Sequence, residues 1–161
     1  LVRSIKDIPI WNTLTTGPGR GRPYMEDGRV LKMQVLKSVA FGADGTLQWW
    51  WGPMDGRHYH GYARASKILA TNERFFVDGE MREDLLDGEE VPGTSRVAWK
   101  HDGEALVMLF NDSTDETQTV TATLTEDMTI ARDDGRGDLT LEDGLLSASC
   151  APLSCRWLVI R

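Results

Sequence analysis

The apolar and polar positions divide this chain into a first part with helical spacing and a second part in which they alternate. From about Glu26 to Phe41, apolar residues recur every three or four positions: Leu31, Val35, Leu36 and Val39. This spacing predicts a helix, and Gly42 is a natural residue to end it. A second helix is predicted from Tyr59 to Phe76, with its buried side on Tyr62, Ala65, Ile68 and Leu69.

Each predicted helix follows a predicted strand. Residues 5–16 and 46–51 are short stretches rich in β-branched or aromatic side chains, and Gly/Pro-rich loops follow both. The order strand, loop, helix, strand, loop, helix is typical of α/β barrels, in which chemistry lies on the strand-to-helix side. Two such units cannot close a barrel. We therefore expect further strands from a missing N-terminal barrel portion or from another chain.

The period changes after residue 95. Seven short runs separated by turn signals follow, and in one of them the threonines of 117–123 alternate with Gln118, Val120, Ala122 and Leu124. Alternation without helical spacing predicts a small antiparallel β-sandwich. The predicted organisation is thus α/β plus all-β: the end of a barrel over residues 1–80, a connector over 81–94 and a sandwich over 95–161.

One stretch also carries a family resemblance. The string Ser-Val-Ala-Phe-Gly-Ala-Asp at residues 38–44, a strand ending at Trp51 and the pair His60-Gly61 resemble the last barrel turn of glycoside hydrolase family 42 β-galactosidases and their relatives. The resemblance covers roughly residues 8–76. It implies that the first part is the last two βα units of a TIM barrel. The chain departs from the family at Gly52, where the family has Arg, and at Arg57, where it has Glu, so a related barrel glycosidase of the same clan is expected.

The resemblance further implies two catalytic carboxylates, an acid/base on the fourth strand and a nucleophile at the end of the seventh. The fourth strand is not in this chain, and the nucleophile slot falls near Thr13, where no Glu stands. The nearest acids, Glu26 and Asp27, are better explained as first-turn residues that complement the helix dipole. The catalytic residues are therefore unknown, and the chain alone is expected to be inactive.

Candidate substrate-binding residues surround the second strand-to-helix loop. Trp51 and Trp49 are expected to stack on a sugar ring, because an indole offers a broad apolar face, while Trp50 points to the other side and packs. His60 and His58 are candidates to hydrogen-bond sugar hydroxyls or a catalytic carboxylate, the alternative being half-exposed histidines at a helix start. Asp55 either holds a substrate hydroxyl or belongs to an Asp-Gly turn.

Charge and composition narrow the function classes. The net charge is −7, and the acidic excess lies in the second half, which argues against a nucleic-acid partner. No apolar run is long enough to span a membrane and no signal-peptide core is visible, so a soluble protein, cytoplasmic or secreted, is expected. No pattern indicates a metal or another cofactor.

Three questions stay open on the sequence. Cys150 and Cys155 form either a small disulfide loop or two free thiols. The chain is expected to belong to a glycosidase acting on a carbohydrate substrate, but a non-catalytic carbohydrate-binding or structural module, including an inactivated glycosidase with Thr13 in the nucleophile slot, is the alternative. A third hypothesis is an α+β domain with no role in sugar binding.

Overall fold

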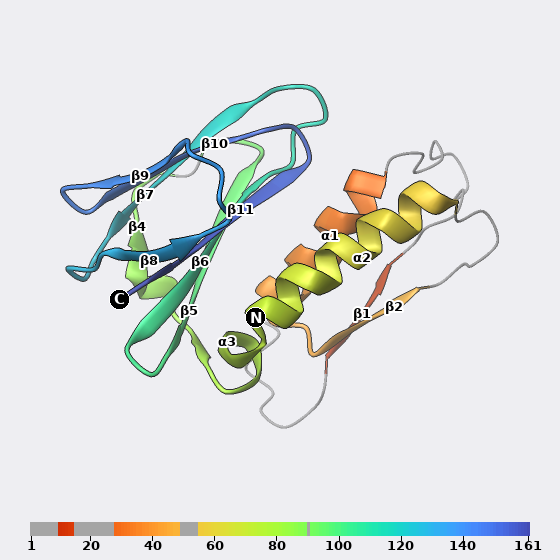
Figure 1. Cartoon of the computed structure of the whole chain (residues 1–161), viewed down its shortest axis with the longest axis horizontal. Helices are drawn as coiled ribbons and strands as arrows, with labels where there is room; N and C mark the ends of the chain where they lie inside the picture. Colours follow the sequence, from red (N-terminus) through yellow and green to blue (C-terminus); the bar gives the residue numbers. More distant parts are fainter. Residues whose placement is uncertain (1–9, 15–27, 49–54, 90) are drawn as a thin grey trace. The chain divides into compact units, whose positions relative to one another are not determined.

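A computed structural model describes residues 10–14, 28–48, 55–89 and 91–161. The chain divides into two compact units, Leu1–Thr71 and Asn72–Arg161. Figure 1 labels their elements. The units are described separately below.

The first unit has the predicted strand-helix-strand-helix order. Its elements are β1 (Trp11–Leu14), α1 (Gly28–Ala40), β2 (Gly45–Gln48) and α2 (Gly56–Thr71). The two strands are parallel, with Trp11 opposite Gly45 and Leu14 opposite Gln48. The helix predicted from Glu26 begins within the described residues at Gly28, and the strand predicted to end at Trp51 is described as far as Gln48.

A Schellman motif ends α1 at the predicted glycine. Gly42 has φ of 98°, its amide donates to the Val39 carbonyl at 2.9 Å, and the Ala43 amide donates to the Ser38 carbonyl at 2.9 Å. Glycine adopts this left-handed conformation without a steric penalty. The next residue, Asp44, accepts a hydrogen bond from the Ile10 amide at 2.7 Å and therefore joins the starts of the two strands.

The second helix is shorter than predicted. It ends at Thr71, and a separate short helix, α3 (Glu73–Val77), follows after Asn72. Asn72 is fully buried, and its side-chain oxygen accepts a hydrogen bond from Arg132 at 2.8 Å. The spacing of apolar residues continued through position 76, but this long-range contact belongs to the second unit and divides the helix.

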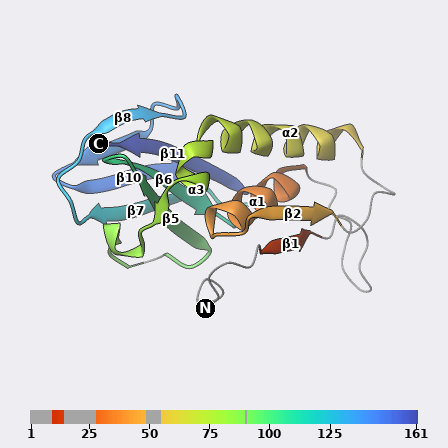
Figure 2. The same cartoon turned by 90° about the horizontal axis from the view of Figure 1, so that it is seen from below.

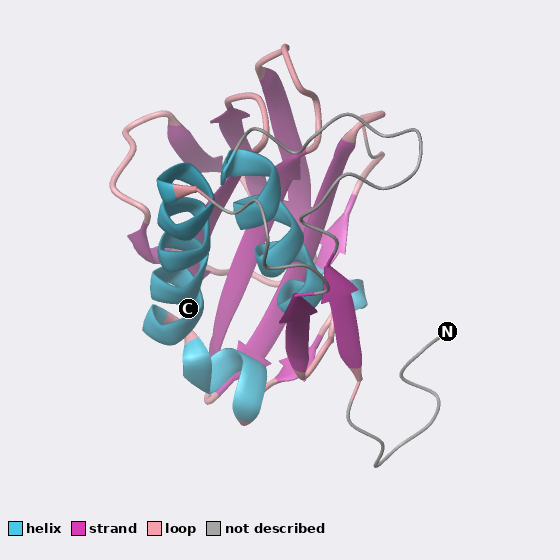
Figure 3. Cartoon of the chain, turned by 90° about the vertical axis from the view of Figure 1, so that its right-hand side faces the viewer, coloured by secondary structure: helices cyan, strands magenta, loops and turns pink. Residues whose placement is uncertain are grey.

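Two antiparallel sheets make up the second unit (Figures 1 and 2). One has the strand order β3-β5-β6-β11-β8 and the other β4-β7-β10-β9. Their strands are β3 (Glu80–Met81), β4 (Leu86–Asp87), β5 (Thr94–His101), β6 (Glu104–Asn111), β7 (Gln118–Leu124), β8 (Ile130–Asp133), β9 (Leu139–Glu142), β10 (Leu145–Cys150) and β11 (Ser154–Ile160). All seven strands expected after residue 95 are found, and Figure 3 shows the strands in magenta.

The segment expected to be a connector forms part of this unit. It contributes β3 and β4, one to each sheet, and the short 3-10 helix Glu83–Leu85 between them. Leu85 is fully buried in the core. The surrounding charges concealed this role in the sequence, because the apolar residues of the segment are few and stand among several acids and Arg82.

One core joins the two sheets. It is built from Leu85 of the 3-10 helix and from inward-facing positions of both sheets, which are Ala98, Ala105, Val107, Leu109, Val120, Leu124, Leu146, Ala148, Cys150, Leu158 and Ile160. In β7 the predicted alternation is found, since Val120, Ala122 and Leu124 are buried while Thr119 and Thr123 are exposed. Alternate burial of this kind is what a sheet with one solvated face requires.

Candidate functional site

The described part of the predicted site is the first turn of α2, which follows β2. Asp55 is the residue before the helix, and its Oδ1 accepts hydrogen bonds from the amides of Arg57 at 2.9 Å and His58 at 3.3 Å. The carboxylate thus caps amides that have no partner within the helix. The Asp-Gly pair that sequence analysis treated as a turn or a sugar ligand is a helix cap.

Two side chains of the same turn also bind this carboxylate. Arg57 donates from Nε at 2.8 Å and pairs through Nη2 at 2.7 Å, while the ring Nδ1 of His58 lies 2.9 Å from Oδ1. The Arg57 guanidinium, followed by His58, holds the pKa of Asp55 well below its usual range. The lowered pKa favours the ionised carboxylate, which accepts all of these hydrogen bonds.

The two histidines of the predicted site have different environments. His58 is buried, with 4% of its surface exposed, and its ring faces the cap. His60 lies two residues further along α2 and is exposed. Of the two, His60 is therefore the one that a ligand in solution reaches directly, and His58 acts on the shape of the turn.

Glycines let the beginnings of α1 and α2 approach closely. A Cβ on Gly61 would lie 2.0 Å from the Gly28 carbonyl oxygen, and a Cβ on Gly28 would lie 2.1 Å from the Arg57 carbonyl oxygen. Any side chain at either position would overlap the neighbouring backbone. The pair His60-Gly61 is part of the family resemblance, whereas no local pattern marks Gly28, whose requirement arises only from the helix contact.

The strand β1 has one face toward α1 and one open face. The Asn12 amide donates to the Ser38 hydroxyl of α1 at 2.7 Å, and Leu14 is buried. Thr13 points to the other side of the strand, is exposed, and lies opposite Leu47, which is 51% exposed. The predicted nucleophile slot is thus on the uncovered face of the two-stranded sheet.

The other residues considered in the sequence lie elsewhere in the chain. Trp49, Trp50 and Trp51 lie outside the described residues. The cysteines are two buried thiols that form no disulfide with each other, and burial raises the pKa of Cys150 to about 11. Within the described ranges, no cluster of three or more His, Cys, Asp or Glu side chains is placed to hold a metal ion, and no helix there is long and apolar enough to cross a bilayer.

Comparison with known proteins places this fold among glycoside hydrolase structures. An alpha-amylase from Geobacillus thermoleovorans matches 83% of this chain at 11% identity and a TM-score of 0.58. A family 30 subfamily 8 xylanase from Clostridium acetobutylicum matches 94% at 10% identity and a TM-score of 0.59. A maltogenic alpha-amylase from Thermotoga neapolitana matches 96% at 10% identity and a TM-score of 0.62.

The matched region is only a part of each of these proteins. The chain spans 34% of the first and 42% of the other two. No family model and no curated protein matches the sequence. These structures are amylases and a family 30 xylanase, so the finer resemblance to family 42 stays a prediction, and what the comparisons establish is a shared fold.

Proposed function

We propose that this chain is the C-terminal portion of a glycoside hydrolase, in which the first unit supplies the last two βα units of a TIM barrel. The remaining strands come from a part of the protein outside this sequence or from another chain. The acid/base residue is supplied there, and the substrate is a carbohydrate. The observation that carries the proposal is the match to several glycoside hydrolase structures across more than four-fifths of the chain.

The open face of β1 and β2 supports the barrel assignment. In a TIM barrel, one face of each strand packs on the helices and the other points into the barrel interior. Here Asn12 and Leu14 are on the helix side, while Thr13 and Leu47 are exposed on the other. A leucine exposed to this extent on a sheet face is explained if neighbouring barrel strands cover it in the complete protein.

The pocket residues then have distinct roles. We infer that Trp51 and Trp49 stack on the sugar and that His60, exposed on α2, hydrogen-bonds its hydroxyls. Asp55 and His58 hold the first turn of α2 in place through their mutual contact and the helix cap. Asp55 and His58 are thus positioning residues rather than sugar ligands.

The test is turnover of chromogenic glycosides by the longer protein that contains this segment. We expect hydrolysis by that protein, none by the 161-residue chain, and a large fall in kcat/KM for Trp51→Ala. Tyr59→Ala is a matched control, because Tyr59 is an exposed aromatic on α2 with 54% of its surface accessible. Turnover by the short chain would overturn the assignment of the acid/base residue to another segment.

A second candidate is a carbohydrate-binding protein without catalysis. Thr13 favours it, because a threonine stands on the exposed face at the position where the family resemblance implies the nucleophile. Calorimetric titration of the longer protein with oligosaccharides separates the two. Binding without hydrolysis supports the second candidate, and the absence of both overturns each proposal.

A further inference from the structure

The segment from β8 to β9 lies at the edge of both sheets. β8 is the last strand of the five-stranded sheet and β9 is the last strand of the four-stranded sheet, so residues 134–138 cross from one sheet to the other (Figure 1). We call Ile130–Glu142 the edge segment. None of the residues of β8 or β9 is fully buried, unlike the central strand β6, in which all but the first residue are.

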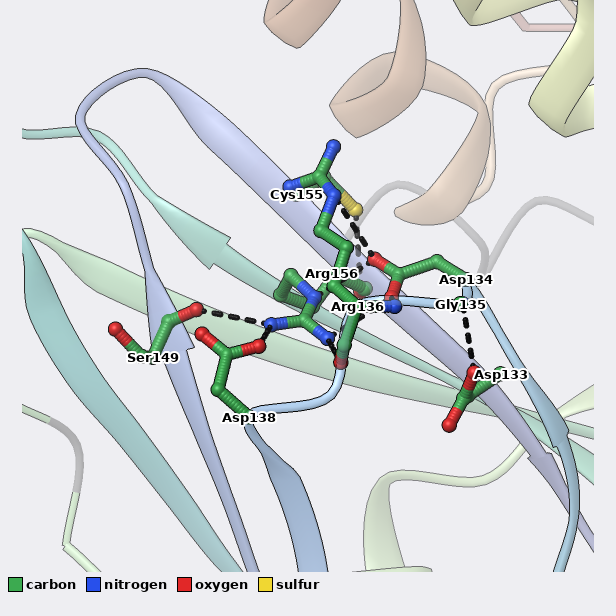
Figure 4. A network of polar contacts seen from close by, with 8 residues as sticks. All are labelled: Asp133, Asp134, Gly135, Arg136, Asp138, Ser149, Cys155 and Arg156. Atoms are coloured by element: carbon green, nitrogen blue, oxygen red, sulfur yellow. Dashed lines mark hydrogen bonds and ion pairs between the residues drawn. The ribbon is translucent and has the colours of Figure 1, made fainter.

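One buried arginine binds this crossing. Arg156 of β11 donates to both oxygens of Asp134, at 2.7 Å from Nε and 2.9 Å from Nη2. It also donates to the Arg136 carbonyl at 2.6 Å, to Asp138, and to the Ser149 carbonyl of β10 at 3.1 Å (Figure 4). The five bonds engage the full donor set of a guanidinium, and the side chain is 1% exposed.

The other attachments of the edge segment are its strand pairings and a few side-chain contacts. β8 pairs with β11 through three residues, with an irregularity between Val159 and Ile160, and β9 pairs with β10 through four. Arg132 adds its bond to Asn72, and Leu139 and Leu141 pack partly against the core. A segment with little buried apolar surface opens more readily than the core strands, and the Arg156 contacts are what fasten the crossing between its two strands.

We propose that the edge segment opens separately from the rest of the second unit and that the Arg156 contacts keep it closed. When the Arg156 ion pairs are lost, by substitution or by acid, the edge segment detaches before the two sheets separate. The reason is that Arg156 is buried, and removing one partner leaves an uncompensated charge that is relieved most easily by exposing it to water. Opening the crossing does this without disturbing β5, β6 or β7.

The charged groups around Arg156 determine in which direction pH changes the stability of the closed edge segment. Asp134 and Asp138 face Arg156 from the crossing, Arg136 and Asp133 flank them, and the Cys150 thiol of β10 interacts with Arg156 electrostatically. Its hydrogen bond to Arg156 lowers the pKa of Asp138 below the ordinary value. A lowered pKa means that this stabilisation is complete above the ordinary aspartate range and is lost as pH falls through the lower folded value.

Trypsin is a direct probe, because Arg136 is itself a cleavage site and its carbonyl is held by Arg156. At neutral pH we expect the full chain to resist cleavage after Arg136, and Arg156→Met and Asp138→Asn to be cut there first. For Arg156→Met the increase in rate should exceed about a hundredfold, because cleavage follows the open population. Asp143→Asn is the control, since Asp143 lies in the β9–β10 turn, has φ of 50° and does not contact Arg156.

Hydrogen exchange of the unmodified chain tests the acid opening and covers the case in which Arg156→Met fails to fold. On lowering the pH, the amides of the edge segment should lose protection before those of β5–β7. The proposal is overturned if both regions lose protection together, or if the variants are cut after Arg136 no faster than Asp143→Asn.

Discussion

The two units of this chain bury their sheets in opposite ways. In the second unit, two antiparallel sheets share one core, and Leu109 and Leu158 are completely inaccessible. In the first unit, a two-stranded parallel sheet is packed on α1 from one side and leaves Leu47 exposed on the other. Parallel sheets are normally covered on both faces. The difference teaches that the second unit buries its apolar residues between its own two sheets, whereas the described strands of the first unit leave Leu47 exposed.

Truncating one leucine in each unit to alanine gives the largest expected difference in the free energy of unfolding. Leu109→Ala should lower the free energy of unfolding by about 2–5 kcal/mol, because it removes buried atoms and leaves a cavity. Leu47→Ala should change it by less than about 0.5 kcal/mol in this chain, since the side chain is exposed. Urea denaturation measures both values. A cost for Leu47→Ala as large as for Leu109→Ala would show that the open face is already covered.

Adding a side chain where α1 and α2 contact each other should destabilise the first unit. Gly61→Ala is expected to cost about 1–3 kcal/mol, because the new methyl group would overlap the Gly28 carbonyl. Gly56→Ala, at the start of the same helix, has open space around it and is the control. Thermal unfolding followed by circular dichroism compares the two. Equal midpoints would mean that the α1–α2 contact does not limit stability.

Two asparagines, one buried and one exposed, sharpen the comparison at a smaller scale. Asn111 is fully buried, and its amide donates to the carbonyls of Glu116, Cys150 and Ala151. Asn111→Ala should cost about 1–3 kcal/mol because buried acceptors lose their donor. Asn12→Ala removes one bond on an exposed residue of β1 and should cost about 0.5–1.5 kcal/mol. Chemical denaturation that ranks them the other way would contradict this account.

The smallest effect is expected at the cap of α2. Asp55→Asn should lower stability slightly at neutral pH, because asparagine caps a helix well but loses the charge that pairs with Arg57 and His58. The lowered pKa of Asp55 places its contribution above the ordinary aspartate range, so it disappears only in strong acid. The difference in unfolding midpoint between the two proteins should therefore shrink as pH falls, and a constant difference would contradict the role of the charge.

Local pattern was enough for most of the elements. The helical spacing ending at Gly42 identified α1 and its stop, and the alternating threonines identified β7, because both depend on neighbours a few residues away. The break at Asn72 and the place of Leu85 in the core were missed. Each depends on a partner that is distant in sequence, Arg132 for the first and the inner faces of both sheets for the second.

The candidate site shows the same division. The sequence identifies Asp55, His58 and His60 as a group, because residues of those types cluster at a strand-to-helix turn. It could not tell which histidine is buried, since residues two apart on a helix point in different directions and only packing decides which side is covered. It also gave no role to Arg156, whose partners at 134–138 and Ser149 meet only when the sheets assemble.

The sequence by itself determined the change from helical to alternating periodicity, and with it an α/β part followed by a β part. It determined this because secondary structure follows from where apolar side chains recur along the chain. Tertiary structure alone decided that Gly28 and Gly61 must lack side chains, and that Arg156 meets Asp134 and Asp138 in the segment between β8 and β9. These roles arise from contacts between distant residues, and no local pattern encodes such contacts.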